Sequence, residues 1–289
     1  MAGILSVVGT PIGNLDDASP RVVETLRTAD VVLCEDTRVT SKLLARFDVR
    51  VPLMRADEHT IASRVGPVIE RCERGERVAF VSDAGMPCVS DPGQRLVDAC
   101  LDAGVRVEVI PGPSAVTCAL AASGLASEHF FFEGFLPRKA GPQRRRLETL
   151  ASFGATLVVY ESPRRVASTL QTIADVMPAR RVALVRELTK VHEECVRDLA
   201  PALAGRMADV EVRGECVIVV EGAREDETQA GSALEERIPL EEAMAAGLAA
   251  GEPKSALAKR LAKSYGLSRS EVYERLVGSA GQAGQGGLG

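Results

Sequence analysis

Short apolar runs alternate with helical patterns in the first part of the chain, and most runs end in a loop rich in small or charged residues. The runs contain many β-branched residues, which favour strands, and the segments between them have the spacing of amphipathic helices. This alternation predicts a parallel sheet covered by helices. The predicted strands of this part are Ile4–Val8, Val31–Cys34, Val78–Val81 and Arg106–Val109.

A second set of apolar runs begins near residue 130, accompanied by helical patterns near residues 143–151 and 163–175. The fold class predicted for the chain is therefore α/β, with two α/β domains of comparable size. We expect the N-terminal domain over residues 1–115 and the C-terminal domain over residues 116–222. The predicted strands of the second domain are Phe130–Phe135, Thr156–Tyr160, Arg181–Val185 and Cys216–Val220.

The last part of the chain has a different character. Residues 223–236 are polar and acidic, as expected of a linker. Three short helical patterns follow over residues 237–277, and Ser268 with Glu271 gives a capping box for the third. Their spacing resembles a helix-turn-helix, and a three-helix packing module with basic solvent faces fits it equally well. Residues 278–289 are rich in glycine and carry no charge, which predicts disorder.

The loop after the third predicted strand combines aspartates with small residues. A long loop at the carboxyl end of a parallel strand is where open α/β sheets bind ligands. Asp83 is suited to accept hydrogen bonds from a ligand, and Gly85 permits close approach of the backbone, although a surface turn uses the same residue types. Asp91 and Pro92 predict the N-cap and first turn of the next helix.

Composition and charge narrow the functional classes. The chain has 289 residues, 46% of them hydrophobic, and no apolar run long enough to span a bilayer. Its start lacks the basic region of a signal peptide, so we expect a cytoplasmic protein without membrane contact. Seven cysteines without C-x-x-C spacing and three histidines predict no metal site. With a net charge of -5, any contact with nucleic acid must come from local patches.

Two familiar nucleotide-binding patterns are missing from the glycine-rich strand ends. None of them carries G-x-G-x-x-G after the first strand or G-x-x-x-x-G-K-[ST]. The sequence therefore supports neither a Rossmann dinucleotide site nor a P-loop, and a NAD enzyme or a kinase is not expected.

Two clusters of charged residues are candidates for contact with a polyanion. Glu35, Asp36 and Arg38 follow the second strand and would either orient a phosphate-bearing ligand or form a solvated salt-bridge cluster. Five cations with no acid among them lie on a loop leading to a helix, where RNA-phosphate contact competes with a plain solvated face. These candidate RNA-binding residues are Arg138, Lys139, Arg144, Arg145 and Arg146.

Seven motifs spread over residues 4–221 are informative together. They are VVGTPIGNLDD at 7–17, CEDTR at 34–38, VSDAGMPCVSDPG at 81–93, VIPGPSA at 109–115, FEGFLPRK at 132–139, YESPRR at 160–165 and RELTKVHEE at 186–194. This set resembles the tetrapyrrole-methylase superfamily, and most closely its branch called ribosomal small-subunit RNA methyltransferase I. The resemblance implies two α/β domains with the cofactor S-adenosyl-L-methionine in the cleft between them, in a homodimer.

The resemblance also implies a function and a set of cofactor contacts. The implied reaction is 2'-O-methylation of a cytidine in the 16S RNA of the small ribosomal subunit. Small-molecule branches carry Gly-Gly-Asp-Pro where this chain has residues 82–85, SDAG, which favours the RNA branch. The implied cofactor-binding residues are Pro11, Val81, Ser82, Asp83, Met86, Ser114, Ala115, Glu161, Leu188 and Thr189.

The identity of the base is open at this point. A ribose hydroxyl has a high pKa, so a side chain must remove its proton as the bond forms, or water must take it afterwards. Glu35, Asp36, Glu161 and Glu187 all lie at strand ends, and we choose Glu35, Asp36 and Arg38 as the catalytic candidates. Two other functions remain: a tetrapyrrole C-methyltransferase, and a non-enzymatic nucleic-acid-binding regulator built on the helical module.

Overall fold

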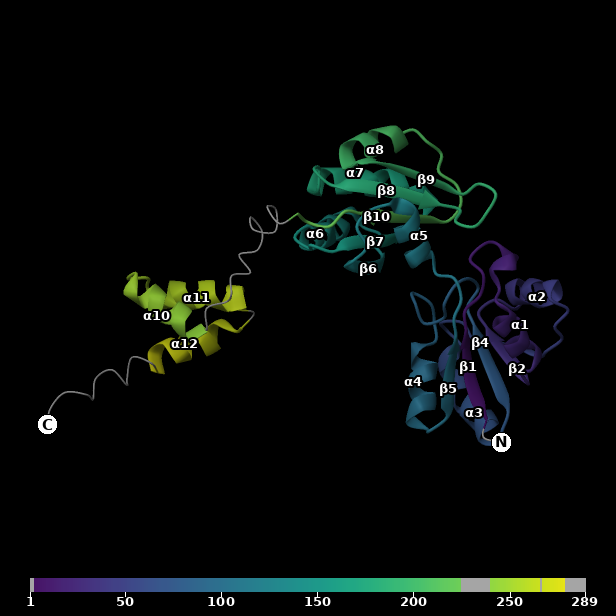
Figure 1. Ribbon diagram of the computed structural model, residues 1–289. Helices are drawn as coiled ribbons and strands as arrows, with labels where there is room; N and C mark the ends of the chain where they lie inside the picture. Colours follow the sequence, from purple (N-terminus) through teal and green to yellow (C-terminus); the bar gives the residue numbers. More distant parts are fainter. Residues whose placement is uncertain (1–2, 225–239, 266, 279–289) are drawn as a thin grey trace. The chain divides into compact units, whose positions relative to one another are not determined.

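The computed structural model describes residues 3–224, 240–265 and 267–278 (Figure 1). The chain divides into two compact units, residues 1–225 and 226–289. The expected linker at 223–236, apart from its first two residues, lies outside the described residues, and so does the expected disordered tail at 278–289 after its first residue. None of the described helices is long and apolar enough to cross a membrane.

The first sheet has five parallel strands in the order β3-β2-β4-β1-β5, which confirms the predicted α/β class. The short edge strand β3 was not predicted, because its three residues are only partly buried and show no clear apolar run. The strands are β1 (Ile4–Val8), β2 (Val31–Cys34), β3 (Leu53–Arg55), β4 (Arg77–Val81) and β5 (Arg106–Ile110).

Helices cover both faces of this sheet. Successive side chains of a strand point to opposite faces, so Leu33 packs towards α3 and α4 while Val32 packs towards α1 and α2. The hydroxyl of Ser19 caps α1 by accepting the N–H of Val22, and Pro20 occupies the first turn of the helix. These helices are α1 (Pro20–Arg27), α2 (Thr37–Arg46), α3 (Ile61–Glu73) and α4 (Gln94–Asp102).

The second sheet is mixed, with the order β6-β7-β10-β8-β9. Only β6 and β7 pair in parallel, and the other neighbours are antiparallel. The edge strand β9 was not predicted, because half of its side chains are charged and none of them is buried. The strands are β6 (Phe130–Phe135), β7 (Thr156–Glu161), β8 (Arg181–Arg186), β9 (Glu194–Leu199) and β10 (Cys216–Val220).

This sheet is also covered on both faces. Helix α5 (Ala115–Ser123) contributes Val116, Ala119 and Leu120 to the core on one face. The opposite face packs against α6 (Ala140–Leu150), α7 (Val166–Val176) and α8 (Ala200–Met207), and a short 3-10 turn, η2 (Pro163–Arg165), precedes α7. Helix α5 begins at the expected domain boundary, and it packs against the second sheet rather than the first.

The second unit is a group of three helices, α10 (Leu240–Ala249), α11 (Lys254–Tyr265) and α12 (Arg269–Gly278). Their apolar residues meet in one small core that includes Met244, Leu257 and Leu276. The N–H of Glu271 donates to the hydroxyl of Ser268, which is the expected cap of the third helix.

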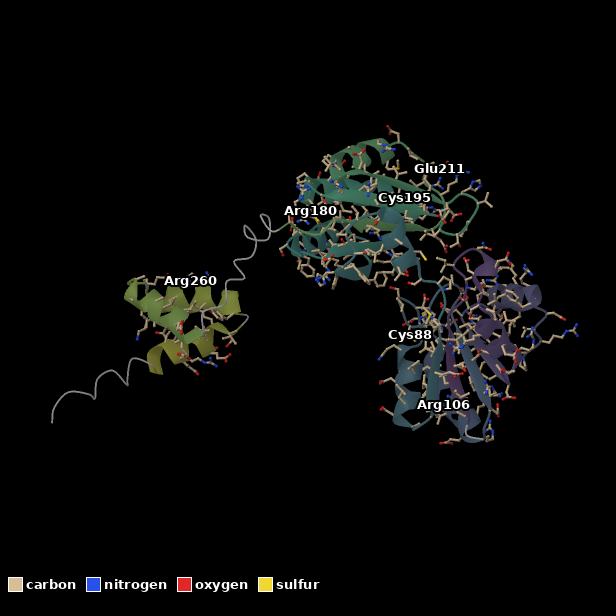
Figure 2. The ribbon with its side chains drawn as sticks, in the orientation of Figure 1. Cys88, Arg106, Arg180, Cys195, Glu211 and Arg260 are labelled. Carbon is tan, nitrogen blue, oxygen red and sulfur yellow. The ribbon has the colours of Figure 1, made fainter. Side chains whose placement is uncertain are left out.

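The cysteines are free thiols, as their scattered positions suggest. Cys88 and Cys195 lie in different parts of the first unit (Figure 2), and none of the seven is paired in a disulfide. Burial raises the pKa of Cys72 and of Cys216 to about 11, so both stay protonated and pack as small apolar side chains.

Candidate active site

A cavity of about 560 Å³ lies within the first unit, at the carboxyl ends of strands from both sheets. Its size falls in the range of small-molecule sites. The first sheet contributes loops after β1, β2, β4 and β5, and the second sheet contributes the ends of β6 and β7, the loop after β8 and the start of β10. The lining residues are Ile12, Glu35, Asp83–Met86, Val89–Asp91, Ser114, Ala115, Phe135, Tyr160–Pro163, Leu188 and Gly214–Val217.

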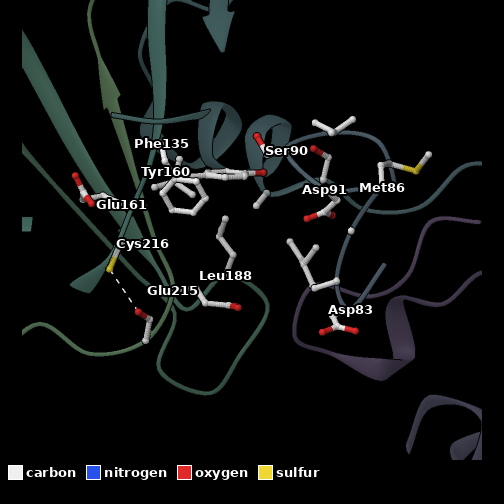
Figure 3. A pocket seen from close by; sticks show the side chains of 18 of the residues that line it. Asp83, Met86, Ser90, Asp91, Phe135, Tyr160, Glu161, Leu188, Glu215 and Cys216 are labelled. Atoms are coloured by element: carbon white, nitrogen blue, oxygen red, sulfur yellow. Dashed lines mark hydrogen bonds between the residues drawn. The ribbon is translucent and has the colours of Figure 1, made fainter. Parts of the chain in front are cut away.

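The charge of this cavity is negative. Among the described residues that line it, none is a lysine, arginine or histidine, whereas five are acidic. Figure 3 labels Asp83, Asp91, Glu161 and Glu215 among them. Apolar side chains such as Met86, Leu188 and Val217 share the lining with these carboxyl groups. The cavity therefore suits a ligand that carries a positive charge and an apolar part. The acidic lining residues are Glu35, Asp83, Asp91, Glu161 and Glu215.

Backbone contacts between the loops after β1 and β4 fix one wall. Thr10 and Gly85 form a two-way bridge, with N–H to O distances of 2.9 and 3.1 Å. The Thr10 hydroxyl also donates to the carbonyl of Ser82 at 3.2 Å. Gly85 has a φ of +83°, a conformation that glycine adopts without strain. The close backbone approach expected at Gly85 is therefore present.

The predicted cofactor residues fall into two groups. Six of them line the cavity: Asp83, Met86, Ser114, Ala115, Glu161 and Leu188. The other four are not among its lining residues. Val81 and Ser82 are buried, with 0% and 2% of their surface exposed, and Pro11 is buried as well. The Thr189 hydroxyl accepts the N–H of Asn14 at 3.0 Å, so this residue holds two loops together.

Glu161 reaches the cavity, but its oxygens are engaged inside the protein. Its side chain is fully buried and lies 3.4 Å from the guanidinium of Arg165. One oxygen accepts the N–H of Ser162 at 2.8 Å, and the other accepts the hydroxyl of Thr169 at 2.7 Å. Thr169 in turn accepts an N–H of Gln143 at 2.9 Å. Glu161 therefore anchors the segment after β7 rather than offering a free acceptor.

Glu35 has the electrostatic properties of a proton acceptor. Its partial burial, together with the negative charges of Asp91 and Asp83, raises the pKa of Glu35 to about 7. The loops after β2 and β4 hold each other: the carboxylate of Glu35 accepts the backbone N–H of Asp83, and that of Asp83 accepts the backbone N–H of Asp36 at 3.0 Å. Glu35 can thus change its protonation state near neutral pH while facing the cavity.

Asp91 is a correction to the sequence-based prediction. Helix α4 begins at Gln94 with Gly93 as its N-cap, at a φ of +134°, so Asp91 does not cap it. The chain instead continues through an irregular loop, and the Asp91 carboxyl group points into the cavity near Ser90 (Figure 3). Burial raises the pKa of Asp91 to about 6, against the opposing effect of a hydrogen bond from Ser82. The Asp-Pro pattern at 91–92 predicts a helix cap and does not indicate that Asp91 lines the cavity.

Asp36 and Arg38 do not line the cavity. Asp36 is the N-cap of α2, and its carboxylate accepts the backbone N–H of Arg38 at 2.9 Å. The guanidinium of Arg38 folds back onto the same carboxylate, and these hydrogen bonds hold the pKa of Asp36 well below its usual range. The structure therefore separates the three catalytic candidates and leaves only Glu35 facing the cavity.

The five basic residues at 138–146 also differ in whether their charges are paired within the protein. Arg146 makes two hydrogen bonds to Glu133, at 2.7 and 2.6 Å, and Arg144 pairs with Asp175 at 2.5 Å. The acids come from outside the cluster in sequence, so the sequence pattern did not reveal them. The other three side chains are exposed and make no ion pair with a described residue; they are Arg138, Lys139 and Arg145.

Sequence reasoning missed part of the lining. Phe135 ends β6 and Tyr160 is the next-to-last residue of β7, and they lie beside one another at the cavity (Figure 3). Glu215 lies directly before β10, outside the apolar run that predicts this strand. An aromatic or acidic residue at the end of a predicted strand was the available signal, because those strand ends meet at one edge of the sheet.

A family model and several known proteins match most of this chain. A family model described as Tetrapyrrole (Corrin/Porphyrin) Methylases matches residues 5–204. A protein named ribosomal RNA small subunit methyltransferase I, from Mesorhizobium japonicum, is 43% identical over 98% of this chain and 94% of its own length. The protein of that name from Mycobacterium bovis is 42% identical over 98% of each chain. The one from Thermotoga maritima, 42% identical, covers 76% of this chain and 99% of itself.

Solved structures show the same fold at lower identity. A cobalt precorrin-4 methyltransferase matches with a TM-score of 0.59 and 20% identity, covering 76% of this chain and 95% of its own. A uroporphyrin-III C-methyltransferase from Thermus thermophilus matches with a TM-score of 0.53 and 20% identity, covering 80% and 98%.

Proposed function

Because this chain belongs to the ribosomal RNA small-subunit methyltransferase I family of the tetrapyrrole methylases, we propose that it methylates a cytidine in small-subunit ribosomal RNA, with Glu35 as the base. Membership makes it an S-adenosylmethionine-dependent methyltransferase that acts on a ribose 2'-hydroxyl of the 16S RNA. The observation that carries the choice of base is a carboxyl group with a pKa of about 7 that faces the cavity.

The lining fits S-adenosylmethionine. The cavity offers carboxylates for a positively charged sulfonium and amino group, and Met86 and Leu188 for apolar contact. Asp83, Ser114 and the backbone near Gly85 supply acceptors and donors for the polar parts. When bound, the cofactor supplies an activated methyl group on a neutral leaving group, so the protein's task is mainly to position the acceptor.

The chain's own residues would act on the acceptor hydroxyl. Glu35 in its carboxylate form accepts the hydroxyl proton as the oxygen gains its methyl group. Asp91 keeps Glu35 basic enough, since the negative charge of Asp91 disfavours a second charge nearby. Two hydrogen bonds join Asp83 to the loop that carries Glu35, so the base is fixed relative to the loop after β4.

Methyl transfer to purified small ribosomal subunits tests this function directly. Subunits come from cells that lack the protein, and labelled S-adenosylmethionine is the donor. We expect label in a 2'-O-methylcytidine, found by nucleoside mass spectrometry, and its loss on Asp83→Ala because the two-loop contact and a cofactor acceptor are removed. Transfer to a tetrapyrrole but not to RNA would contradict the proposal, since it is the outcome that the small-molecule alternative requires.

The three cations that make no ion pair with a described residue, Arg138, Lys139 and Arg145, form the proposed RNA-contacting surface. We expect Arg138→Gln, Lys139→Gln and Arg145→Gln together to weaken RNA binding and to reduce its salt dependence, by about 0.7 in the log–log slope for each phosphate that is no longer neutralised. Arg144→Gln, whose guanidinium already pairs with Asp175, is the matched control and should change the slope less. Binding is measured as Kd against potassium chloride concentration. An unchanged slope in the triple variant would argue against this surface.

Other parts of the proposal come from the resemblance alone. A homodimer and a cytoplasmic location stay predictions. The Thermotoga maritima relative has no counterpart for about a quarter of this chain. We infer that methyl transfer requires the first unit, which contains the cavity.

A further inference from the structure

Phe135 is an exposed aromatic residue at the edge of the cavity. It ends β6, lines the cavity and has 61% of its surface exposed, which is unusual for a phenylalanine. The cofactor contacts and the proton transfer described above do not use it. An aromatic ring that borders a ligand cavity and remains open to solvent is available to a second ligand.

The local backbone explains why the ring lies there. A β-bulge shifts the pairing of β6 with β7 between Phe132 and Gly134, and bulges redirect the side chains that follow them. Gly134 has a φ of +71°, and a Cβ at this position would lie 3.2 Å from the hydroxyl oxygen of Ser90. Both restrictions favour glycine before Phe135, so the exposed ring is built into the strand.

The ring is also supported from behind. Phe135 packs edge-to-face against Tyr160, with ring centroids 5.7 Å apart and an interplanar angle of 65°. Tyr160 packs in turn against Phe132, at 4.9 Å and 67°. This row of three rings holds Phe135 in place and leaves it partly exposed, and the rings of Phe135 and Tyr160 are seen together in Figure 3. A fixed, exposed ring is a surface on which a planar group can stack.

The surroundings select the chemistry of that group. Arg138 and Lys139 follow Phe135 closely in sequence, are exposed, and make no ion pair with a described residue. The cavity itself is lined by carboxyl groups, which repel phosphate. A nucleotide can satisfy both conditions if its uncharged base and ribose approach the cavity while its phosphates stay at the cations.

We propose that Phe135 stacks on the base of the nucleotide that is methylated, and so presents its ribose hydroxyl to Glu35. This inference rests on the proposed function and adds the element that recognises the nucleotide. Unstacked bases of single-stranded RNA commonly stack on aromatic side chains. Phe135 would therefore be a positioning residue that holds the base after the nucleotide has left its helix.

The first test compares variants of two exposed phenylalanines of the same strand. We expect Phe135→Ala to lower kcat/KM for small subunits about 5- to 150-fold, the range expected when one base loses its stacking partner. Phe135→Tyr keeps the ring and should restore most of the activity. Phe130→Ala is the matched control, because Phe130 is 47% exposed and does not line the cavity.

Cofactor binding and crosslinking give readouts besides activity. Calorimetric titration of S-adenosylmethionine should give the same Kd for Phe135→Ala as for the wild type. A photoreactive benzoylphenylalanine in place of Phe135 should crosslink to the methylated nucleotide or to its immediate neighbour. Sequencing of the crosslinked RNA identifies the site.

The outcomes separate this inference from the proposed function. Wild-type activity of Phe135→Ala, weaker cofactor binding by that variant, or crosslinks only to a second copy of this chain would each overturn the stacking role and leave the function standing. If the wild-type protein transfers no methyl group to small subunits, the proposed function fails, and the inference fails with it. A loss of activity that Phe135→Tyr restores, with unchanged cofactor binding, supports the inference.

Discussion

Glu35→Gln is expected to lower kcat for methyl transfer by about 10²- to 10⁴-fold, the usual contribution of a general base. Glutamine keeps the size of the side chain and can still accept the N–H of Asp83, but it cannot take a proton. The measurement is kcat with saturating small subunits and cofactor. The Kd for S-adenosylmethionine is measured alongside and should change little, so that a catalytic defect is not mistaken for a binding defect.

The pH dependence gives the same hypothesis a second test. A base works only when it is unprotonated, and the pKa of Glu35 is raised to about 7. Wild-type kcat should therefore rise with pH through about 7 and level off above it. Asp91→Asn removes a negative charge that raises this pKa, so its profile should move to lower pH. A flat wild-type profile, or a near-normal rate for Glu35→Gln, would rule out Glu35 as the base.

The same raised pKa has an effect on stability with a defined sign. The folded protein binds the Glu35 proton more tightly than the unfolded chain does, so stability falls as pH rises from about 4.5 to about 7. Glu35→Gln should therefore raise Tm at pH values above this window and leave it nearly unchanged below. A substitution that removes activity while raising Tm would show that the base is held at the cost of stability.

Gly112→Ala is expected to disrupt the cavity wall and to destabilise the protein. A Cβ at Gly112 would lie 2.6 Å from the carbonyl carbon of Gly9 and 2.7 Å from its Cα, distances that real Cβ atoms do not show. Both neighbours are backbone atoms, so no side chain can rotate away. The loops before Ser114 and after β1 must then separate, and the N–H of Gly9 loses its hydrogen bond to the carbonyl of Ile110.

We expect a loss of about 1–3 kcal/mol in the free energy of unfolding, together with weaker cofactor binding. Gly205→Ala in α8 is the matched control, because a Cβ there meets nothing within 4 Å and alanine favours a helix by roughly 0.5–1 kcal/mol. Urea unfolding and cofactor titration measure the two effects. Equal stability of the two alanine variants would show that the contact between the glycines can relax.

The sequence is a good guide wherever burial dominates. Strands such as β1 and β10 have every residue buried, and their sequences are apolar throughout apart from Ser6 in β1, so they are marked clearly. The edge strands β3 and β9 lie partly in solvent, and their sequences lack that pattern. Six of the ten implied cofactor residues line the cavity, because motifs at strand ends meet at one edge in this fold.

Local sequence was a poorer guide to which charged side chains are free. Asp36 and Arg144 each lie in a group of charged residues in the sequence. Asp36 accepts a hydrogen bond from Arg38 at its own helix cap, whereas Arg144 pairs with Asp175 on another helix. Asp91 before Pro92 suggested a cap, and the positive φ of Ser90 and Gly93 gives the chain another course. These outcomes depend on partners that only the folded chain brings together.

All charged side chains among the described lining residues are acidic, and this affects the release of product at the end of each reaction cycle. Transfer of the methyl group turns a positively charged sulfonium into an uncharged thioether. The carboxyl groups are no longer attracted to the sulfur of the product, in which only the amino group stays positively charged, so the site holds fresh cofactor more tightly than spent cofactor. The charge of the cavity therefore favours release of the product, and product inhibition should be weaker than in an uncharged cavity.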